Sequence, residues 1–336
     1  MAAALAPLAL SMGEPSGIGP DLILRLFSQR AELRLPPFVV YGNVPFLRAR
    51  AARLGIEVAF GTPEADFATT LPVLDIDGMV PDNPGAPTAL SGKVVMEAIA
   101  RAVADTLRGT TRGLVTAPIH KGVLYSAGFK YPGHTEYLAA LCATPGNAPR
   151  LPVMMLAHEE LRTIPLTIHV PLHEVPGLVT TDLILKTTRI VAHDLRNRFG
   201  IAEPRIGIAG LNPHAGEGGT IGRQEVDIIG PAVAALVHEG IAAEGPFPAD
   251  TLFFPAHWRQ YDAVIAMYHD QALIPIKTVA FDEAVNVTLG LPIVRTSPDH
   301  GTAFGIAGTG KASANAVIAA IRMAGEIAAR RATVSR

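Results

Sequence analysis

The fold of this chain is indicated most clearly by one stretch, Asp262-Ala-Val-Ile-Ala-Met-Tyr-His-Asp-Gln-Ala272. Its first half is a short apolar run, which predicts a buried strand of an α/β sheet. The run ends at Met267, and four polar residues, Tyr268 to Gln271, follow at its carboxyl end. Ligands of α/β proteins bind at the carboxyl ends of the strands. The stretch therefore predicts a fold class and the position of a functional site.

Similar apolar runs alternate with longer helical patterns along the whole chain. Strands are predicted at residues 8–11, 38–41, 73–76, 113–117, 152–156, 163–169, 205–210 and 263–267. Helices are predicted at residues 20–29, 44–54, 89–107, 135–143, 181–199, 224–239 and 313–328. This alternation predicts an α/β fold with a mostly parallel sheet and helices on its faces. Because no linker or repeat separates the segments, any two lobes are expected to be interleaved in sequence.

Composition narrows the class of protein. The 336 residues are 49% apolar and only 17% charged, which argues against disorder. The apolar runs are broken by Gly and Pro and fall short of the roughly 20 residues that span a bilayer. A net charge of −2 argues against nucleic-acid binding and against a membrane surface. The apolar N-terminus lacks a basic leader and reads as a first strand, so we expect a soluble cytoplasmic protein.

Three histidines stand at the ends of predicted strands. His169 ends the strand at 163–169, His214 follows the strand that ends at Gly210, and His269 follows Met267. Three imidazoles in such positions are a plausible divalent-metal triad with open positions for a substrate. A lone histidine is more often a core or surface residue, and it is the shared strand-end position that favours the metal.

Cations and flexible backbone follow the last of these histidines. Lys277, Asn286 and Arg295 precede the glycine-rich run from His300 to Gly310. Arginine suits planar recognition of a carboxylate or phosphate, and glycines allow close approach of a nucleotide. The alternative is that each is an ordinary surface residue. Together they suggest an anionic substrate beside a cofactor.

Three further segments allow two interpretations each. The glycines from Gly13 to Gly19 form either a tight strand-to-helix turn or a ligand loop, and their spacing is not G-x-G-x-x-G. In the segment 116–121, His120 or Lys121 either reaches a ligand or lies in a solvated loop. In Pro132-Gly-His-Thr-Glu136, Thr135 is expected to cap the following helix. His134 would then lie just outside the positive end of that helix, where the second interpretation has it contact a phosphate.

Taken together, these segments resemble the family of 4-hydroxythreonine-4-phosphate dehydrogenases, enzymes of pyridoxal 5′-phosphate biosynthesis. The matching segments, in family order, are Met12-Gly-Glu-Pro-Ser-Gly-Ile-Gly-Pro20, Thr116-Ala-Pro-Ile-His-Lys121, Pro132-Gly-His-Thr-Glu136, Leu211-Asn-Pro-His-Ala-Gly-Glu-Gly-Gly219, Tyr268-His-Asp-Gln-Ala272 and Arg295-Thr-Ser-Pro-Asp-His-Gly-Thr-Ala303. They span nearly the whole chain, and their conjunction is far more specific than any one motif. The departures are Glu14, Ser16 and His120.

The resemblance implies a two-lobed fold similar to that of isocitrate and isopropylmalate dehydrogenases, which is not a Rossmann fold. The chain 1–336 would then be a single catalytic unit, with a first lobe at about 1–130 plus 270–336 and a second at about 131–269. It also implies a homodimer with an interfacial active site. The glycine run resembles an adenosine-binding loop, so Gly301, Gly305, Gly308 and Gly310 are expected to bind the cofactor.

Residue roles carry over from the same resemblance. Metal ligands are expected at His169, His214 and His269, with His269 supplied by the other subunit. Substrate contacts are expected at His134, Thr135, Lys277, Asn286 and Arg295. Asp250 matches a position near the metal, and Asp250 and Lys277 are the candidates for the general base.

The implied reaction is metal-dependent oxidative decarboxylation of 4-phosphooxy-L-threonine to 3-amino-2-oxopropyl phosphate and CO2, with reduction of NAD or NADP. One divalent ion per subunit, zinc, magnesium or cobalt, is expected. Rival substrates on the same scaffold are threonate or erythronate 4-phosphate and aromatic cis-dihydrodiols. The alternative that is not an enzyme is a catalytically inactive protein that binds a phosphorylated ligand.

Overall fold

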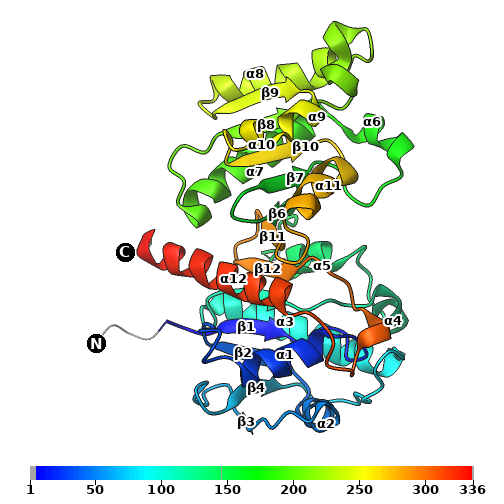
Figure 1. Cartoon of the computed structure of the whole chain (residues 1–336), viewed down its shortest axis with the longest axis vertical. Coiled ribbons are helices and arrows are strands. Elements are labelled where there is room, and N and C mark those ends of the chain that lie inside the picture. The colour runs from blue at the N-terminus through cyan, green and yellow to red at the C-terminus, as the bar shows by residue number, and fades with distance from the viewer. Residues whose placement is uncertain (1–4, 145, 335–336) are drawn as a thin grey trace. The chain divides into compact units, whose positions relative to one another are not determined.

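The computed structural model describes residues 5–144 and 146–334, which divide into two compact units (Figure 1). Unit 1 consists of the described residues up to Pro152 together with Leu291–Ala329, and unit 2 consists of Val153–Gly290 and the residues from Arg330 on. The units are thus interleaved in sequence. Their boundaries fall later in the chain than the expected 130 and 270, because residues 134–141 pack against a helix of unit 1 and residues 285–289 pair with a strand of unit 2.

Unit 1 is built on a sheet in which every pairing is parallel. The strand order is β3 (Phe60–Gly61), β4 (Leu71–Asp75), β2 (Phe38–Gly42), β1 (Leu8–Ser11), β5 (Leu114–Thr116) and β12 (Arg295–Pro298). Its long helices are α1 (Gly19–Ser28), α2 (Val44–Leu54), α3 (Gly92–Arg108) and α12 (Asn315–Val334). Helix α3 packs across β1, β2 and β5. In Figure 1 it lies behind these strands, whereas α12 lies in front.

Unit 2 is built on a mixed sheet. The strand order is β11 (Val285–Leu289), β6 (Val153–Ala157), β7 (Arg162–Pro165), β10 (Ala263–Ala266), β8 (Ile206–Ala209) and β9 (Ala243–Phe247). Strand β6 pairs antiparallel with both of its neighbours, and the other pairings are parallel. The long helices are α7 (Thr181–Phe199), α8 (Gly230–His238) and α11 (His269–Val279). The predicted α/β class with a mostly parallel sheet is confirmed.

Shorter elements complete both units. The short helices are α4 (Lys121–Ser126), α5 (His134–Leu141), α6 (Val175–Leu178), α9 (Ala249–Leu252) and α10 (Pro255–Trp258). The remaining elements are the single 3-10 turns η1 (Ala89–Ser91), η2 (Leu172–Glu174) and η5 (Phe304–Ile306), the irregular seven-residue segment η3 (Pro213–Gly219) and the π-helix η4 (Glu225–Ile229). Within the part of the chain that the structure describes, no helix is long and apolar enough to cross a membrane.

Local signals explain the elements that match the predictions. Helix α7 begins where the Thr180 hydroxyl accepts the Leu183 N–H at 3.2 Å, and it ends at Gly200, which has a left-handed φ of 73°. Helix α2 is capped in the same way by Asn43, whose side chain accepts the Phe46 N–H at 3.0 Å. Caps of this kind supply partners for backbone groups that a helix end leaves unpaired.

Two predictions near the site were wrong. The strand predicted at 163–169 ends at Pro165, so His169 lies in the loop after β7. No helix was predicted after Tyr268, but residues 269–279 form α11, which tolerates Pro275 within it. Strands β11 and β12 were not predicted at all. Strand β12 was not predicted because its sequence, Arg-Thr-Ser-Pro, is polar, although all four residues are buried.

Candidate functional site

Unit 1 contains a buried guanidinium at the carboxyl end of β5. Arg295 is only 4% exposed, and its Nε and Nη2 both donate to the Thr116 hydroxyl, at 3.2 and 2.7 Å. Burial lowers the pKa of Arg295 to about 10, so the group still carries its charge at neutral pH. Thr116 is itself 1% exposed and fixes the plane of the guanidinium. The arrangement is suited to a planar anion.

His134 lies beside this charge at the start of α5. Its ring is half-buried, and its Nε2 is shut off from solvent with no hydrogen-bond partner. Burial, assisted by the charge of Arg295, holds the pKa of His134 well below its usual value. The imidazole is therefore neutral at physiological pH, and it adds a hydrogen-bonding group without adding a second charge.

Thr135 does not cap α5, contrary to the prediction. The N-cap is Gly133, and Thr135 is the second residue of the helix. The helix starts one residue earlier because Gly133 adopts the extended backbone that an N-cap requires. The Thr135 hydroxyl therefore does not cap the helix. Three of the five predicted substrate-binding residues, His134, Thr135 and Arg295, belong to unit 1.

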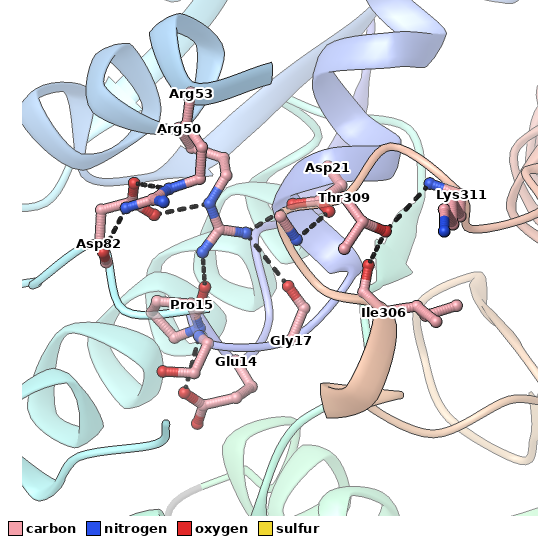
Figure 2. Close-up of polar contacts among 12 residues, drawn as sticks. Glu14, Pro15, Gly17, Asp21, Arg50, Arg53, Asp82, Ile306, Thr309 and Lys311 are labelled. Atoms are coloured by element: carbon pink, nitrogen blue, oxygen red, sulfur yellow. Dashed lines mark hydrogen bonds and ion pairs between the residues drawn. The ribbon is translucent and has the colours of Figure 1, made fainter. Parts of the chain in front are cut away.

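The glycine-rich run is attached to the first loop and first helix of unit 1. The Thr302 carbonyl accepts the Ile18 N–H at 3.0 Å, and the Asp21 carboxylate accepts the Gly308 N–H at 2.6 Å. The other oxygen of Asp21 binds Arg50 at 2.5 Å. Figure 2 shows Arg50 at the centre of this cluster. The loop predicted to bind the cofactor is thus held by a side chain of α1.

Arg50 organises the surroundings of that loop. It is completely buried and donates to the carbonyl of Pro15 at 2.6 Å and to the carboxylate of Asp82 at 2.6 Å, as Figure 2 shows. Arg53 also binds Asp82, at 2.7 Å. Sequence reasoning missed Asp21, Arg50 and Asp82, because ion pairs between distant segments leave no local pattern.

The four predicted cofactor glycines differ in their surroundings. Gly308 has a φ of 72°, and a side chain there would meet Pro84 at 2.6 Å. A side chain at Gly301, Gly305 or Gly310 would meet nothing within 4 Å. Beside the loop is a cavity of about 350 Å³, lined by Gly308, Gly310 and the outer face of α1. The loop is therefore tightly fixed at Gly308 and open to a ligand elsewhere.

In unit 2, two of the predicted metal ligands face each other. The ring centres of His169 and His269 are 5.7 Å apart, and both line a cavity of about 300 Å³. Two imidazoles bound tetrahedrally to one zinc ion, through bonds of about 2.1 Å, have ring centres roughly 5 Å apart. The Nδ1 of His269 lies 2.7 Å from the Asp270 carboxylate. A proton on Nδ1 donated to Asp270 leaves Nε2 to ligate, so this pair fits a metal ion.

His214 does not join that pair. It is exposed in η3, and it has a left-handed φ of 52° in a run where residues 214–218 all have positive φ. His169 has a similar φ of 47°. Strained non-glycine backbone is concentrated at functional sites. Across residues 5–144 and 146–334 no group of three or more His, Cys, Asp or Glu side chains is arranged to hold a metal ion. One chain thus brings together two of the three predicted ligands.

The remaining predicted residues are also in unit 2. Lys277 lies on α11, with its ammonium 5.7 Å from the centre of the Phe281 ring. Asn286 is half-buried on β11. Asp250 is exposed in the first turn of α9, a helix that contacts the η3 segment of His214.

The segment 116–121 contributes a residue that was not singled out. His120, for which ligand contact was one of two interpretations, accepts the Val123 N–H at 3.4 Å and caps α4, with its ring edge-on to Phe304. The contribution of the segment is Thr116, through Arg295. A threonine at the carboxyl end of a buried parallel strand was the signal that could have identified it.

Comparison with known proteins gives consistent results. The sequence pattern of the family described as "Pyridoxal phosphate biosynthetic protein PdxA" matches residues 34–324. A 4-hydroxythreonine-4-phosphate dehydrogenase of Methylorubrum populi is 52% identical over 331 residues, covering 96% of this chain and 95% of that protein. The crystal structure of the enzyme of that name from Klebsiella pneumoniae superposes with a TM-score of 0.86 at 40% identity, covering 96% of this chain and 99% of the other. A terephthalate 1,2-cis-dihydrodiol dehydrogenase from Burkholderia xenovorans is more distant, at 28% identity and a TM-score of 0.64, covering 96% and 98%.

Proposed function

Because this chain belongs to the PdxA family of pyridoxal phosphate biosynthetic proteins, we propose that it is a 4-hydroxythreonine-4-phosphate dehydrogenase. The reaction is oxidation of the secondary hydroxyl of 4-phosphooxy-L-threonine, with loss of CO2, to give 3-amino-2-oxopropyl phosphate, in the synthesis of vitamin B6. The observation that carries the proposal for this substrate is the buried Arg295 beside the neutral His134, because a phosphorylated acid presents planar and tetrahedral anions. Composition and family fit a cytoplasmic enzyme.

The residues of unit 1 hold the anionic end of the substrate in this proposal. Arg295 supplies a fixed positive charge in a plane set by Thr116, and His134 and Thr135 supply hydrogen bonds at the start of α5. The helix start adds partial positive charge. Lys277 and Asn286 remain proposed substrate contacts because they match the family's motifs, and Lys277 and Asp250 remain the candidates for the base that takes the hydroxyl proton.

His169 and His269 are proposed to hold a divalent metal ion, with His214 as the third ligand. A bound metal supplies a Lewis acid that lowers the pKa of a substrate hydroxyl. Two features of the chain itself support these ligands: Asp270 would fix the tautomer of His269, and His169 is held in a left-handed backbone conformation. Zinc, cobalt and magnesium are the ions to test, and imidazole ligands favour the first two.

We further propose that the third ligand is supplied by a second copy of the chain. His169 and His269 are already neighbours within one chain, so His214, rather than the expected His269, is the ligand that crosses the interface. Large apolar side chains are exposed in the segment after His169, on α11 and just after α11: Leu172 is 67% exposed, Ile274 64% and Phe281 75%. Exposed apolar side chains of this size, close to a site, are typical of a subunit interface.

Mixed dimers test this division of ligands. In a symmetric dimer made from equal amounts of His214→Ala and His169→Ala chains, half of the dimers are mixed and each carries one intact site, so about a quarter of the wild-type activity should return. Mixing His169→Ala with His269→Ala should restore nothing, because both ligands come from the same side. Restoration in the second mixture and not in the first would mean that His269 crosses instead. No restoration in either would mean that all three ligands come from one chain.

The glycine run is proposed to hold NAD or NADP. Gly308 and Gly310 line the cavity beside α1, together with Arg25 and Arg53. The open space at Gly301 and Gly305 lets a dinucleotide approach the backbone. When bound, the nicotinamide accepts the hydride. Because two arginines at the cavity could bind the additional phosphate of NADP, both NADP and NAD are assayed.

The substrate assignment is tested by following nicotinamide reduction with the purified, metal-loaded protein. We expect turnover of 4-phosphooxy-L-threonine, and loss of most of it in Arg295→Met. Erythronate or threonate 4-phosphate and an aromatic cis-dihydrodiol are assayed in parallel, because the family's fold is shared by a dihydrodiol dehydrogenase. Turnover of the dihydrodiol, which has no phosphate, with none of the phosphorylated acid would overturn the assignment. Tight binding without turnover would indicate an inactive binding protein.

A further inference from the structure

The polar stretch after β10 contains one side chain that the proposed reaction does not use. Gln271, in the first turn of α11, accepts the Met267 N–H through Oε1 at 2.7 Å and donates from Nε2 to the Gly210 carbonyl at 2.8 Å. Met267 directly follows β10, and Gly210 directly follows β8. The half-buried amide therefore joins the ends of two adjacent parallel strands.

A second side chain extends this link to the third strand. The Thr167 hydroxyl donates to the Met267 carbonyl at 2.8 Å, and Thr167 follows β7. Both backbone polar groups of Met267 are thus bound by side chains. Each linked strand end leads to one of the three histidines: Thr167 to His169, Met267 to His269, and Gly210 to His214.

The loop that carries His214 is also held on its other side. The Glu225 carboxylate, 4% exposed, accepts the N–H groups of Leu211 and Asn212, both at 2.7 Å, and the Asn212 side chain at 2.9 Å. The loop then runs through its left-handed residues. Backbone of that kind persists only where surrounding contacts fix it. Gln271 and Glu225 are two such contacts, on the carbonyl of Gly210 and on the next two amides.

We propose that Gln271 is a positioning residue that sets where His214 lies relative to β10, and so controls the affinity of the site for a metal ion. The inference rests on the proposed metal site, but it concerns a residue outside the ligand set. It holds whether His214 serves its own chain or a neighbour, because Gln271 acts on the loop of its own unit. Residues that orient ligands typically change metal affinity by about 10- to 100-fold.

The test is a titration of the metal-free protein with Co²⁺, followed by its visible absorption spectrum. Gln271→Met, which keeps the length and removes both hydrogen bonds, should bind about 10- to 100-fold more weakly and with an altered spectrum. Gln271→Glu keeps an acceptor for Met267 but turns an oxygen toward the Gly210 carbonyl. It should weaken binding to a similar degree, which identifies the link to Gly210 as the one that matters.

The matched control is Gln260→Met. Gln260 also donates its amide to a carbonyl in unit 2, that of Ala256 at 3.1 Å, but it is exposed and lies away from the three strand ends. It should bind Co²⁺ as wild type does. Thermal unfolding of the metal-free forms shows whether a loss of affinity is only a loss of fold. If Gln271→Met does not fold, Gln271→Glu carries the test.

The outcomes separate this inference from the proposed metal site. Binding that is lost in His169→Ala and unchanged in both Gln271 variants overturns the positioning role alone. Equal binding by wild type and His169→Ala overturns the metal site itself, and this inference with it. Weakened binding in the Gln271 variants, with unchanged unfolding temperatures and an unchanged Gln260→Met, supports it.

Discussion

Arg50 and Asp21 form an ion pair of 2.5 Å in which the arginine is completely buried and the aspartate is 3% exposed. The second oxygen of Asp21 accepts the Gly308 N–H at 2.6 Å. One carboxylate therefore connects a buried cation to the backbone of the glycine-rich loop. The position of the proposed cofactor loop therefore depends on a carboxylate that also lines the cavity beside that loop.

Asp21→Asn should raise the KM for the dinucleotide about tenfold while changing the substrate KM little. The amide keeps only one acceptor, so either Arg50 or Gly308 loses its partner, and a hydrogen bond to a charged group contributes roughly 1.5–3 kcal/mol. Steady-state kinetics with each substrate varied in turn measure the split. The control is Asp66→Asn, which also removes a carboxylate that accepts a backbone N–H, in an exposed loop. An unchanged dinucleotide KM in Asp21→Asn would show that Asp21 does not position the loop.

Arg50→Met should destabilise the protein by about 3–5 kcal/mol, because it leaves buried carboxylates without their partner. Arg101→Met removes an arginine that pairs with Glu97 on the surface of α3, and it should cost less than about 0.5 kcal/mol. Urea unfolding of both variants gives the comparison. Similar losses in the two would contradict the central role of the buried pair.

Thr116→Val should weaken binding of the phosphorylated substrate roughly tenfold, since the guanidinium of Arg295 loses the hydroxyl that fixes its plane. Valine has the shape of threonine, so packing is nearly preserved. The measurement is the substrate KM together with kcat, and the control is Thr69→Val, which removes an exposed hydroxyl of unit 1. If the substrate KM of Thr116→Val equals that of wild type, the hydroxyl does not position Arg295.

His134 should make stability depend on pH. Its folded pKa lies well below the unfolded value near 6.5, so below about pH 6.5 the unfolded chain takes up a proton that the folded protein refuses. Stability from this residue is therefore present above that pH and is lost as the pH falls. His134→Gln should flatten the pH dependence of unfolding between pH 5 and 7 by at most about one proton per molecule. The same measurement on a variant of the exposed His173 serves as the control.

The parts of the fold that could be predicted are those specified by nearby residues. Strand β1 and helices α2 and α7 have the predicted bounds, because apolar periodicity and caps lie within each segment. Strand β12 could not be predicted, because its polar residues are satisfied by distant partners: Arg295 by Thr116, and Thr296 by the carbonyl of Ala320. Strand β12 can be buried only when unit 1 has folded and brought these distant partners to it.

The same distinction applies to the site. Three histidines at strand ends were predicted to bind one metal ion, with His269 from another subunit. Within one chain His169 and His269, which follow the adjacent strands β7 and β10, lie close together, and His214 does not join them. Asp21 and Gln271 escaped prediction, because their roles depend on backbone atoms of segments far away in the sequence.

The interleaving of the two units has a consequence for the order in which the protein is made. Unit 2 is almost one continuous stretch, so all six of its strands have been synthesised by Gly290. Unit 1 begins first but receives β12 and α12 only after the strands of unit 2 have been synthesised. Domains generally fold as units while the chain emerges from the ribosome. Unit 2 is therefore expected to fold first, and a nascent chain can bind no anion at Arg295 until the strands of unit 2 have been made.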